Sequence, residues 1–141
     1  MGAAAAPNGQ TGLDLLIRAA PTEVQVVRQA LRRLPIPPSL LDQVTLLASE
    51  VVSNSIEHAG IEPDDPIRVQ VRIAGGSLRV DVIDGGRGGP LPLPGGIRPA
   101  PGASSGWGLY LIDMLATRWG YSRGRCWFEM ELSDSGSSLG P

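Results

Sequence analysis

The sequence contains one cysteine, no lysine and few aromatic residues. Cys126 is the only cysteine among 141 residues, so an intrachain disulfide and a CxxC-type metal site are both excluded. A lone thiol suits a reducing cytosol, although a small, half-buried side chain is the ordinary explanation for such a residue. All twelve basic residues are arginine, and they are scattered rather than gathered with aromatic residues into a basic stripe. Nucleic acid is therefore not an expected partner.

The chain also lacks long apolar stretches. No apolar run approaches the roughly 20 residues that a membrane-spanning helix needs. Residues 1–10 include an alanine stretch, but they have no basic start and no long apolar core, so they do not resemble a signal peptide. We therefore expect a cytoplasmic protein with no membrane partner. The length fits one domain, and a hydrophobic fraction of 42% is typical of a globular fold.

Hydrophobic periodicity divides the chain into strands and helices. Apolar residues that alternate with polar ones predict strands, and apolar residues at helical spacing predict helices. The expected strands are 13–19, 67–73, 78–83, 119–121 and 126–132, and the expected helices are 24–34, 39–59 and 106–116. Gly75-Gly76 is a hairpin signal between two of the strands. The order predicts an α+β two-layer sandwich, in which three helices cover one face of a mixed, mostly antiparallel sheet.

Composition sets the limits of this domain. Residues 1–12 are expected to be a flexible tail, 13–132 to be the folded domain, and the Ser/Gly-rich residues 133–141 to be disordered. Within the domain, residues 85–105 are dominated by glycine and proline and have no apolar periodicity. A stretch of this kind is either a functional loop, such as a lid over a ligand, or a disordered insertion.

The polar side of the second predicted helix carries the first group of residues with useful chemistry. Glu50, Asn54 and His58 lie at i, i+4 and i+8, so they climb one side of the helix in successive turns. An Asn amide oxygen suits Mg²⁺, and a carboxylate one turn away can accept a proton from a hydroxyl or a water molecule. His58 could donate to a phosphate oxygen. A solvated helix face is the alternative interpretation, although asparagine is a poor helix former.

Two glycine clusters follow. The first begins with Asp84 directly after a strand and includes Gly86 and Gly88. A carboxylate there could accept the exocyclic amine of adenine, while the glycines let backbone approach a flat ring; a common Asp-Gly turn is the alternative. The second cluster, Gly106-Trp107-Gly108-Leu109, opens the third helix. Free N–H groups at a helix start favour phosphate oxygens, although an ordinary glycine-containing helix start would have the same sequence.

Neither glycine cluster fits the commoner nucleotide-binding motifs. A chain without lysine has no Walker A loop, and neither cluster lies in a βαβ unit as a Rossmann fingerprint would. The order of the motifs is Glu-x3-Asn-x3-His, then Asp-x-Gly-x-Gly, then a lid, then Gly-x-Gly-Leu. This order resembles the N, G1 and G2 boxes of the GHKL ATPase superfamily, which has the Bergerat ATP-binding fold. The resemblance covers roughly residues 13–132. The short length and the endings Trp119-Gly120 and Cys126-Trp127-Phe128 are similar to its anti-sigma-factor serine/threonine kinase branch, with a histidine-kinase-like ATPase domain.

The resemblance implies a set of site residues for ATP and Mg²⁺. Asn54 would bind Mg²⁺, Asp84 would bind the adenine amine, and Glu50 would be the general base. His58 would contact a phosphate. The glycine-rich segments would supply the rest: Gly86 and Gly88 would line the base pocket, and Gly106, Gly108 and Leu109 would contact the phosphates or close the lid.

The resemblance also implies an activity and partners. Members of this branch phosphorylate a serine of a STAS-domain anti-anti-sigma protein and sequester a sigma factor, which regulates transcription by partner switching. The alternative is a catalytically weak ATP-binding module that sequesters a partner without phosphoryl transfer; Glu50 favours the kinase. Trp107 is bulkier than the small or basic residue expected between the G2 glycines, and the lid is Pro-rich and nearly uncharged. Exposed apolar positions within 24–34 are compatible with a helix-mediated homodimer.

Overall fold

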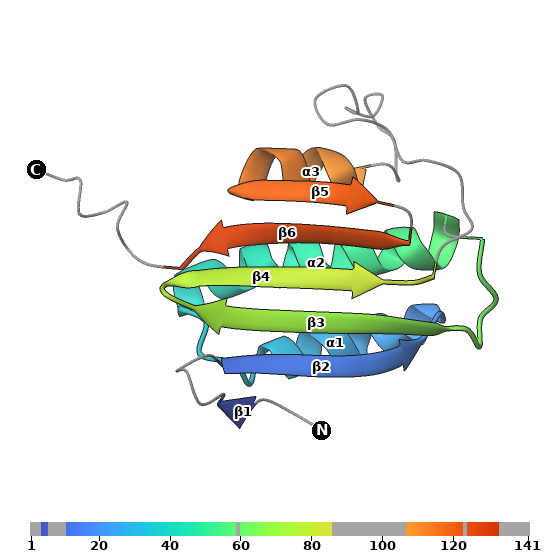
Figure 1. Cartoon of the computed structure of the whole chain (residues 1–141), viewed down its shortest axis with the longest axis horizontal. Helices are drawn as coiled ribbons and strands as arrows, with labels where there is room; N and C mark the ends of the chain where they lie inside the picture. The colour runs from blue at the N-terminus through green and yellow to red at the C-terminus, as the bar shows by residue number, and fades with distance from the viewer. Residues whose placement is uncertain (1–3, 6–10, 59, 86–106, 123, 133–141) are drawn as a thin grey trace, which may run out of the picture.

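The protein is described by a computed structural model over residues 4–5, 11–58, 60–85, 107–122 and 124–132. These residues form two layers, a twisted antiparallel sheet and three helices that all cover one of its faces (Figure 1). The strand order is β1-β2-β3-β4-β6-β5, and every described pairing is antiparallel. The strands are β1 (Ala4–Ala5), β2 (Thr11–Arg18), β3 (Pro66–Ala74), β4 (Ser77–Ile83), β5 (Arg118–Ser122) and β6 (Arg125–Glu131). The predicted α+β two-layer sandwich is confirmed.

Three helices follow one another along the described part of the chain, and the longest of them begins at a proline and is followed by a glycine. A 3-10 turn, η1 (Pro21–Glu23), leads into α1 (Val24–Leu31), and the other helices are α2 (Pro38–His58) and α3 (Trp107–Leu115). The first residue of α2 is Pro38, whose missing N–H costs nothing at that position. Downstream of α2, Gly60 adopts a φ of 71°, a left-handed conformation that glycine adopts without strain and that stops a helix.

The core lies between the two layers. Alternate strand residues such as Val69, Val80 and Phe128 are fully buried against the helices. The apolar stripe predicted on α2 supplies the opposite side, including Val44 and Leu47 with no exposed surface. The β3–β4 connection turns through Gly75 and Gly76, whose φ values of 60° and 78° suit the tight hairpin that the sequence predicts.

The ends of the domain differ in detail from the expected boundaries. Strand β2 begins at Thr11, two residues before the expected start, and Ala4–Ala5 pairs with it, so part of the expected N-terminal tail belongs to the sheet. The expected lid, apart from Gly85, and the expected tail at 133–141 lie outside the described residues. Among the residues that are described, no helix is both long enough and apolar enough to cross a membrane.

Candidate functional site

The three motifs meet at one end of the sheet. The last turn of α2, the end of β4 and the first turn of α3 lie at the same end of the molecule (right side of Figure 1). Helix α2 packs against both β4 and α3, so this arrangement is part of the folded domain. Residues from three distant stretches of sequence are therefore brought to one region.

Helix α2 presents the first motif beside its buried stripe. Val51 and Ser55 face the core with 1% and 6% of their surface exposed, whereas Glu50 and Asn54 are half-buried. Glu50 and Asn54 lie one turn apart and point to the same side of the helix. Such side chains are neither used in the core nor fully solvated, which suits ligand contacts. His58 is the last residue of α2, but its side chain lies outside the described part of the structure.

Asp84 follows the last residue of β4. Its N–H donates to the carbonyl oxygen of Gly124 at 2.9 Å, which fixes the backbone at this point. Val80 and Val82 face the helices, and Asp84 continues their alternation, so its half-buried carboxylate is directed to the helix side of the sheet. Gly85 then turns the chain with a φ of 71°. Gly86 and Gly88 lie outside the described residues.

Cys126 lies beneath this end of the sheet and was not predicted to belong to the site. It pairs with Val82 across β6 and β4 and has 6% of its surface exposed. Burial is the largest cause that raises the pKa of its thiol, and together with the negative charges of Asp84 and Asp81 it brings that pKa to about 12. Val82 lies two residues before Asp84, so the strand register brings the Cys126 side chain to the same end of the sheet as this carboxylate. The strand register, which the sequence alone does not supply, is the signal that reveals this neighbour.

Helix α3 contributes its first turn to the same end of the sheet. Gly108 and Leu109 lie in that turn, while Gly106 and the Leu109 side chain are outside the described residues. The Trp119 Nε1–H group donates to Asp113 Oδ1 at 3.1 Å and joins α3 to β5. This contact holds the later part of α3 against β5. The backbone N–H groups of the first turn of a helix have no partner within the helix, so they can bind an anion.

The donor atoms at this end suit a metal ion that arrives with a phosphate ligand. Within the described residues, no group of three or more His, Cys, Asp or Glu side chains is arranged to hold a metal. Mg²⁺ is commonly bound by one or two protein oxygens together with phosphate oxygens and water. Asn54, with Glu50 one turn away, fits this mode of binding and not a metal site built from protein ligands alone.

A concave region lies elsewhere on the helical layer. A surface hollow of about 310 Å³ separates η1 and α1 from α2, with Arg28, Ser53 and Glu57 in its walls. None of the predicted site residues lines it. Arg28 Nε donates to Ser49 Oγ at 2.9 Å, so this side chain also ties α1 to α2.

Comparisons with known proteins agree with the fold and with the expected family. The sequence matches the profile of the histidine kinase-like ATPase domain over residues 16–132. No curated protein matches it. Among solved structures, the chain is similar to the crystal structure of the RsbU and RsbW domains of Rv1364c from Mycobacterium tuberculosis, with 23% identity and a TM-score of 0.60. That match covers 84% of this chain and 31% of the other, so the two share a fold over a part of the longer protein. The predicted resemblance to the GHKL superfamily is confirmed, and the chain belongs to the histidine kinase-like ATPase domain family.

Proposed function

We propose that this domain is a cytoplasmic, Mg-ATP-dependent protein serine/threonine kinase of the anti-sigma-factor type. Its substrate would be a serine of a STAS-domain partner, and its release or capture of a sigma factor would regulate transcription. Family membership supports ATP as the ligand. The observation that supports the proposal is the packing of α2, which carries Glu50 and Asn54, against β4, which precedes Asp84, and against α3.

Asp84 would select adenine. Its carboxylate accepts the exocyclic amine, a donor that guanine does not offer at the same position. Gly86 and Gly88 would let the backbone lie against the base, because a Cβ there would hold the ring away. The backbone hydrogen bond from Asp84 to Gly124 supports this role, since it positions the carboxylate before the ligand arrives.

Asn54 would bind Mg²⁺ through its amide oxygen, and the start of α3 would hold the phosphates. Gly106, Gly108 and Leu109 would bring backbone N–H groups to phosphate oxygens or close the lid, and His58 would donate to one of them. When bound, Mg²⁺ neutralises the charge of the phosphates. The contribution of the protein is mainly to position the γ-phosphate against the incoming hydroxyl.

Glu50 would act as the general base. It accepts the proton of the partner serine as the serine oxygen bonds to the γ-phosphorus and the bond from that phosphorus to the β–γ bridging oxygen breaks. ADP leaves, and the serine carries the phosphate. The half-buried position of Glu50, one turn from Asn54, supports this role because a carboxylate beside the metal ligand can reach the attacking hydroxyl.

The test of this proposal separates binding from transfer. The Glu50→Gln variant is expected to bind Mg-ATP as the wild type does in calorimetry, and to lose phosphoryl transfer by roughly a hundredfold or more. Asp42→Asn, which neutralises an exposed carboxylate nearer the start of α2, is the matched control. Transfer is measured with γ-labelled ATP on a STAS-domain protein retained from the native cytoplasm, with phosphosite mapping. Wild-type transfer by Glu50→Gln would show that the assigned base is wrong.

The alternative function is an ATP-binding module that captures a partner without phosphorylating it. The same experiment separates the two, because such a module retains its partner in an ATP-dependent manner while no phosphoserine forms with the wild-type protein. Failure of the wild-type domain to bind Mg-ATP would contradict both functions and leave a nucleotide-free scaffold.

A further inference from the structure

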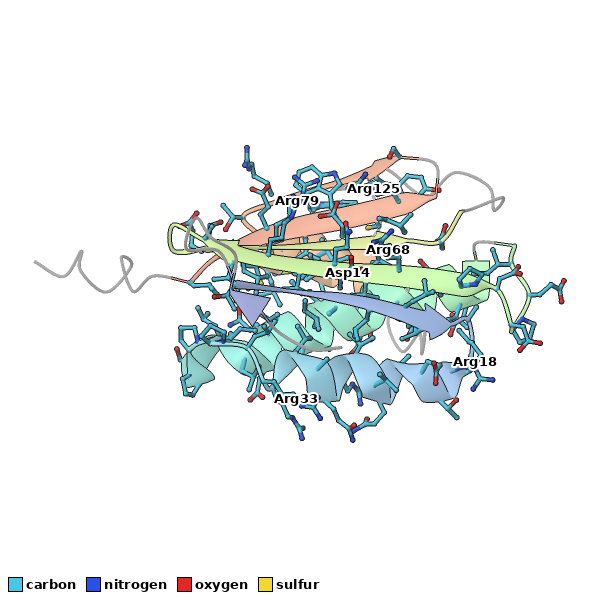
Figure 2. The ribbon with its side chains drawn as sticks, turned by 60° about the horizontal axis from the view of Figure 1, so that its bottom comes forward. Asp14, Arg18, Arg33, Arg68, Arg79 and Arg125 are labelled. Carbon is cyan, nitrogen blue, oxygen red and sulfur yellow. The ribbon has the colours of Figure 1, made fainter. Side chains whose placement is uncertain are left out.

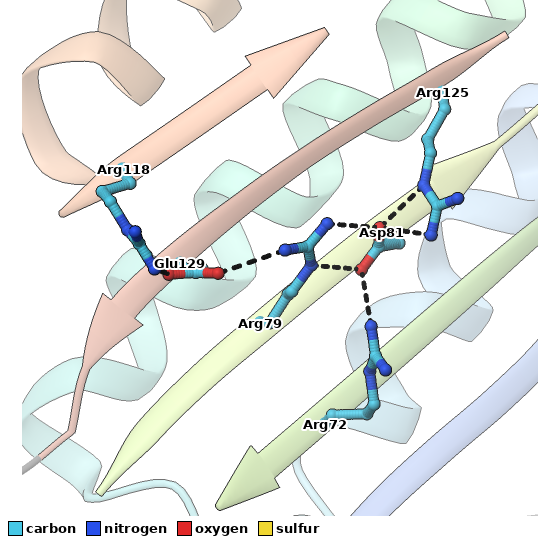
Figure 3. A network of polar contacts seen from close by, with 6 residues as sticks. All are labelled: Arg72, Arg79, Asp81, Arg118, Arg125 and Glu129. Atoms are coloured by element: carbon cyan, nitrogen blue, oxygen red, sulfur yellow. Dashed lines mark hydrogen bonds and ion pairs between the residues drawn. The ribbon is translucent and has the colours of Figure 1, made fainter. Parts of the chain in front are cut away.

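The face of the sheet that the helices leave open carries a cluster of arginines. Four guanidinium groups and two carboxylates form one continuous set of contacts across β3, β4, β6 and β5 (Figure 3). We call this set the arginine cluster; it consists of Arg72, Arg79, Arg118 and Arg125 with Asp81 and Glu129. Figure 2 shows Arg79, Arg125 and the neighbouring Asp14–Arg68 pair on the side of the sheet away from the helices.

Asp81 is the centre of the cluster. It has no exposed surface, and its two carboxylate oxygens accept hydrogen bonds from the Nε–H groups of Arg79 and Arg125, each at 2.9 Å. Burial acts to raise the pKa of Asp81, but the hydrogen bonds from Arg79 and Arg125 outweigh it, and the net pKa is lowered. These two arginines therefore keep the buried carboxylate ionised. Arg72 Nη2 lies 3.6 Å from the same carboxylate. Arg79 and Arg125 already balance the charge of Asp81, so Arg72 adds a positive charge in excess.

The carboxylates of the cluster are less exposed than its guanidinium groups. The side chains of Asp81 and Glu129 have exposed fractions of 0% and 16%, whereas those of Arg72 and Arg118 have 53% and 70%. The described strands place six of the twelve arginines of the chain on this face, together with four of its fourteen acidic residues. Those residues are Arg18, Arg68, Arg72, Arg79, Arg118 and Arg125, with Asp14, Asp81, Glu129 and Glu131. A chain with a net charge of −2 thus presents a positive surface here.

The cluster is held in place before any partner arrives. The guanidinium of Arg79 lies over the Trp127 ring at 4.3 Å from its centroid and donates to both Asp81 and Glu129. Arg118 Nε donates to Glu129 at 3.0 Å from the neighbouring strand. Side chains fixed in this manner lose less conformational entropy on binding than free ones do. Leu16, 69% exposed on β2, adds an apolar contact on the same face.

We propose that the open face of the sheet is a docking surface for an acidic segment of a partner protein. Carboxylates of the partner would accept hydrogen bonds from Arg72 and Arg118, while an apolar side chain would cover Leu16. A second copy of this chain is disfavoured because a twofold pairing of the same face brings two positive surfaces together. A protein is favoured over nucleic acid because the guanidiniums are already bonded to carboxylates and apolar side chains lie among them. The inference does not depend on ATP, since the face lies opposite the helices that carry the proposed nucleotide site.

The test compares two charge-matched double variants. Arg72→Gln/Arg118→Gln removes the two most exposed guanidiniums of the cluster and leaves Arg79 and Arg125 on Asp81. Arg32→Gln/Arg33→Gln removes the same charge from the exposed end of the helical layer, where Figure 2 shows Arg33. The probe is a fluorescently labelled poly-L-glutamate peptide, titrated without nucleotide at low salt and followed by anisotropy. Thermal unfolding of each variant shows whether the fold is retained.

The cluster variant is expected to bind the peptide at least about tenfold more weakly than the wild type, and the control variant to change by less than about threefold. Equal losses in both variants would overturn the proposal, because only general charge attraction would then be measured. No binding to the wild type would overturn it as well. Tighter binding of poly-uridylate with the same dependence on Arg72 and Arg118 would make the face a nucleic-acid surface. If sedimentation shows that the wild type self-associates and the cluster variant does not, the face is a dimer interface. Either this result or the preference for poly-uridylate would overturn the proposal.

Discussion

The indole of Trp127 lies so close to Gly120 that a β-carbon at residue 120 would come within 2.7 Å of its Nε1 atom. The two residues face each other across β5 and β6, and the other side of the indole carries the guanidinium of Arg79. Glycine at this position therefore allows the ring to lie flat on the edge strand. The position of the ring in turn supports the arginine cluster.

Replacing Gly120 should destabilise the domain because the backbone and the ring cannot both keep their places. We expect Gly120→Ala to lower the free energy of unfolding by about 1–3 kcal/mol, the usual cost of overpacking. Chemical denaturation followed by far-UV circular dichroism measures it. Ser122→Ala, an exposed position on the same strand, is the control and should leave the midpoint almost unchanged. An unaltered midpoint for Gly120→Ala would mean that the ring moves away without cost.

Asp81 should contribute more to stability than any exposed carboxylate of the sheet. Asp81→Asn removes the charge that Arg79 and Arg125 surround, and we expect the free energy of unfolding to fall by about 1–3 kcal/mol. This loss is small for a broken buried ion pair, because the arginines themselves remain in contact with water. Asp14→Asn is the matched control, since Asp14 pairs with Arg68 on the same face but is half exposed. Equal losses in the two variants would contradict the structural role assigned to Asp81.

The same carboxylate makes stability depend on pH. The pKa of Asp81 is lowered from its ordinary value of 3.8, so its contribution is fully present above that value and is lost as the pH falls through the lower folded pKa. From about pH 6 to about pH 3, the wild type should therefore lose more stability than Asp81→Asn does. Denaturant midpoints of both proteins across this range provide the measurement. Parallel curves would show that Asp81 titrates no differently in the folded and unfolded states.

Cys126 should be unreactive in the folded domain. Burial and nearby carboxylates raise the pKa of its thiol from 9.0 to about 12, which lowers the thiolate fraction near neutral pH by about a thousandfold. Alkylation by iodoacetamide at pH 8 should be at least about a hundredfold slower in the native protein than in urea. Because the folded pKa is raised, stability from this group is present below 9.0 and is lost as the pH rises towards about 12. Similar native and denatured alkylation rates would contradict this environment.

The sequence predicted the elements of the fold well because each has a strong local signal. Strict alternation in β3 and β4 and the apolar stripe of α2 are visible without any knowledge of pairing, and the hairpin between the strands is marked by Gly75-Gly76. Boundaries were less certain. Ala4–Ala5 and Thr11 join the sheet through backbone hydrogen bonds to a neighbouring strand, which leave no periodic pattern in the sequence.

The candidate site was predicted from the order of three motifs, while its surroundings depend on strand register. A strand residue between Val80 and Val82 points away from the core, yet Asp81 has no exposed surface, because three arginines from three strands cover it. The neighbourhood of Cys126 and Asp84 likewise follows from the pairing of β4 with β6. The contact of Asp81 with Arg125 joins residues 44 positions apart in the chain, and only the folded sheet brings them together.

A calorimetric titration of the domain with Mg-ATP tests the proposed nucleotide site most directly. We expect the wild type to bind one ATP and to discriminate against GTP. Asp84→Asn should bind ATP at least about tenfold more weakly, because it loses a charged acceptor for the adenine amine, while Asp14→Asn binds as the wild type does. An Asp84→Asn variant with wild-type affinity, or a wild-type protein that releases no heat and binds no Mg-ATP, would contradict the proposed site at the end of the sheet.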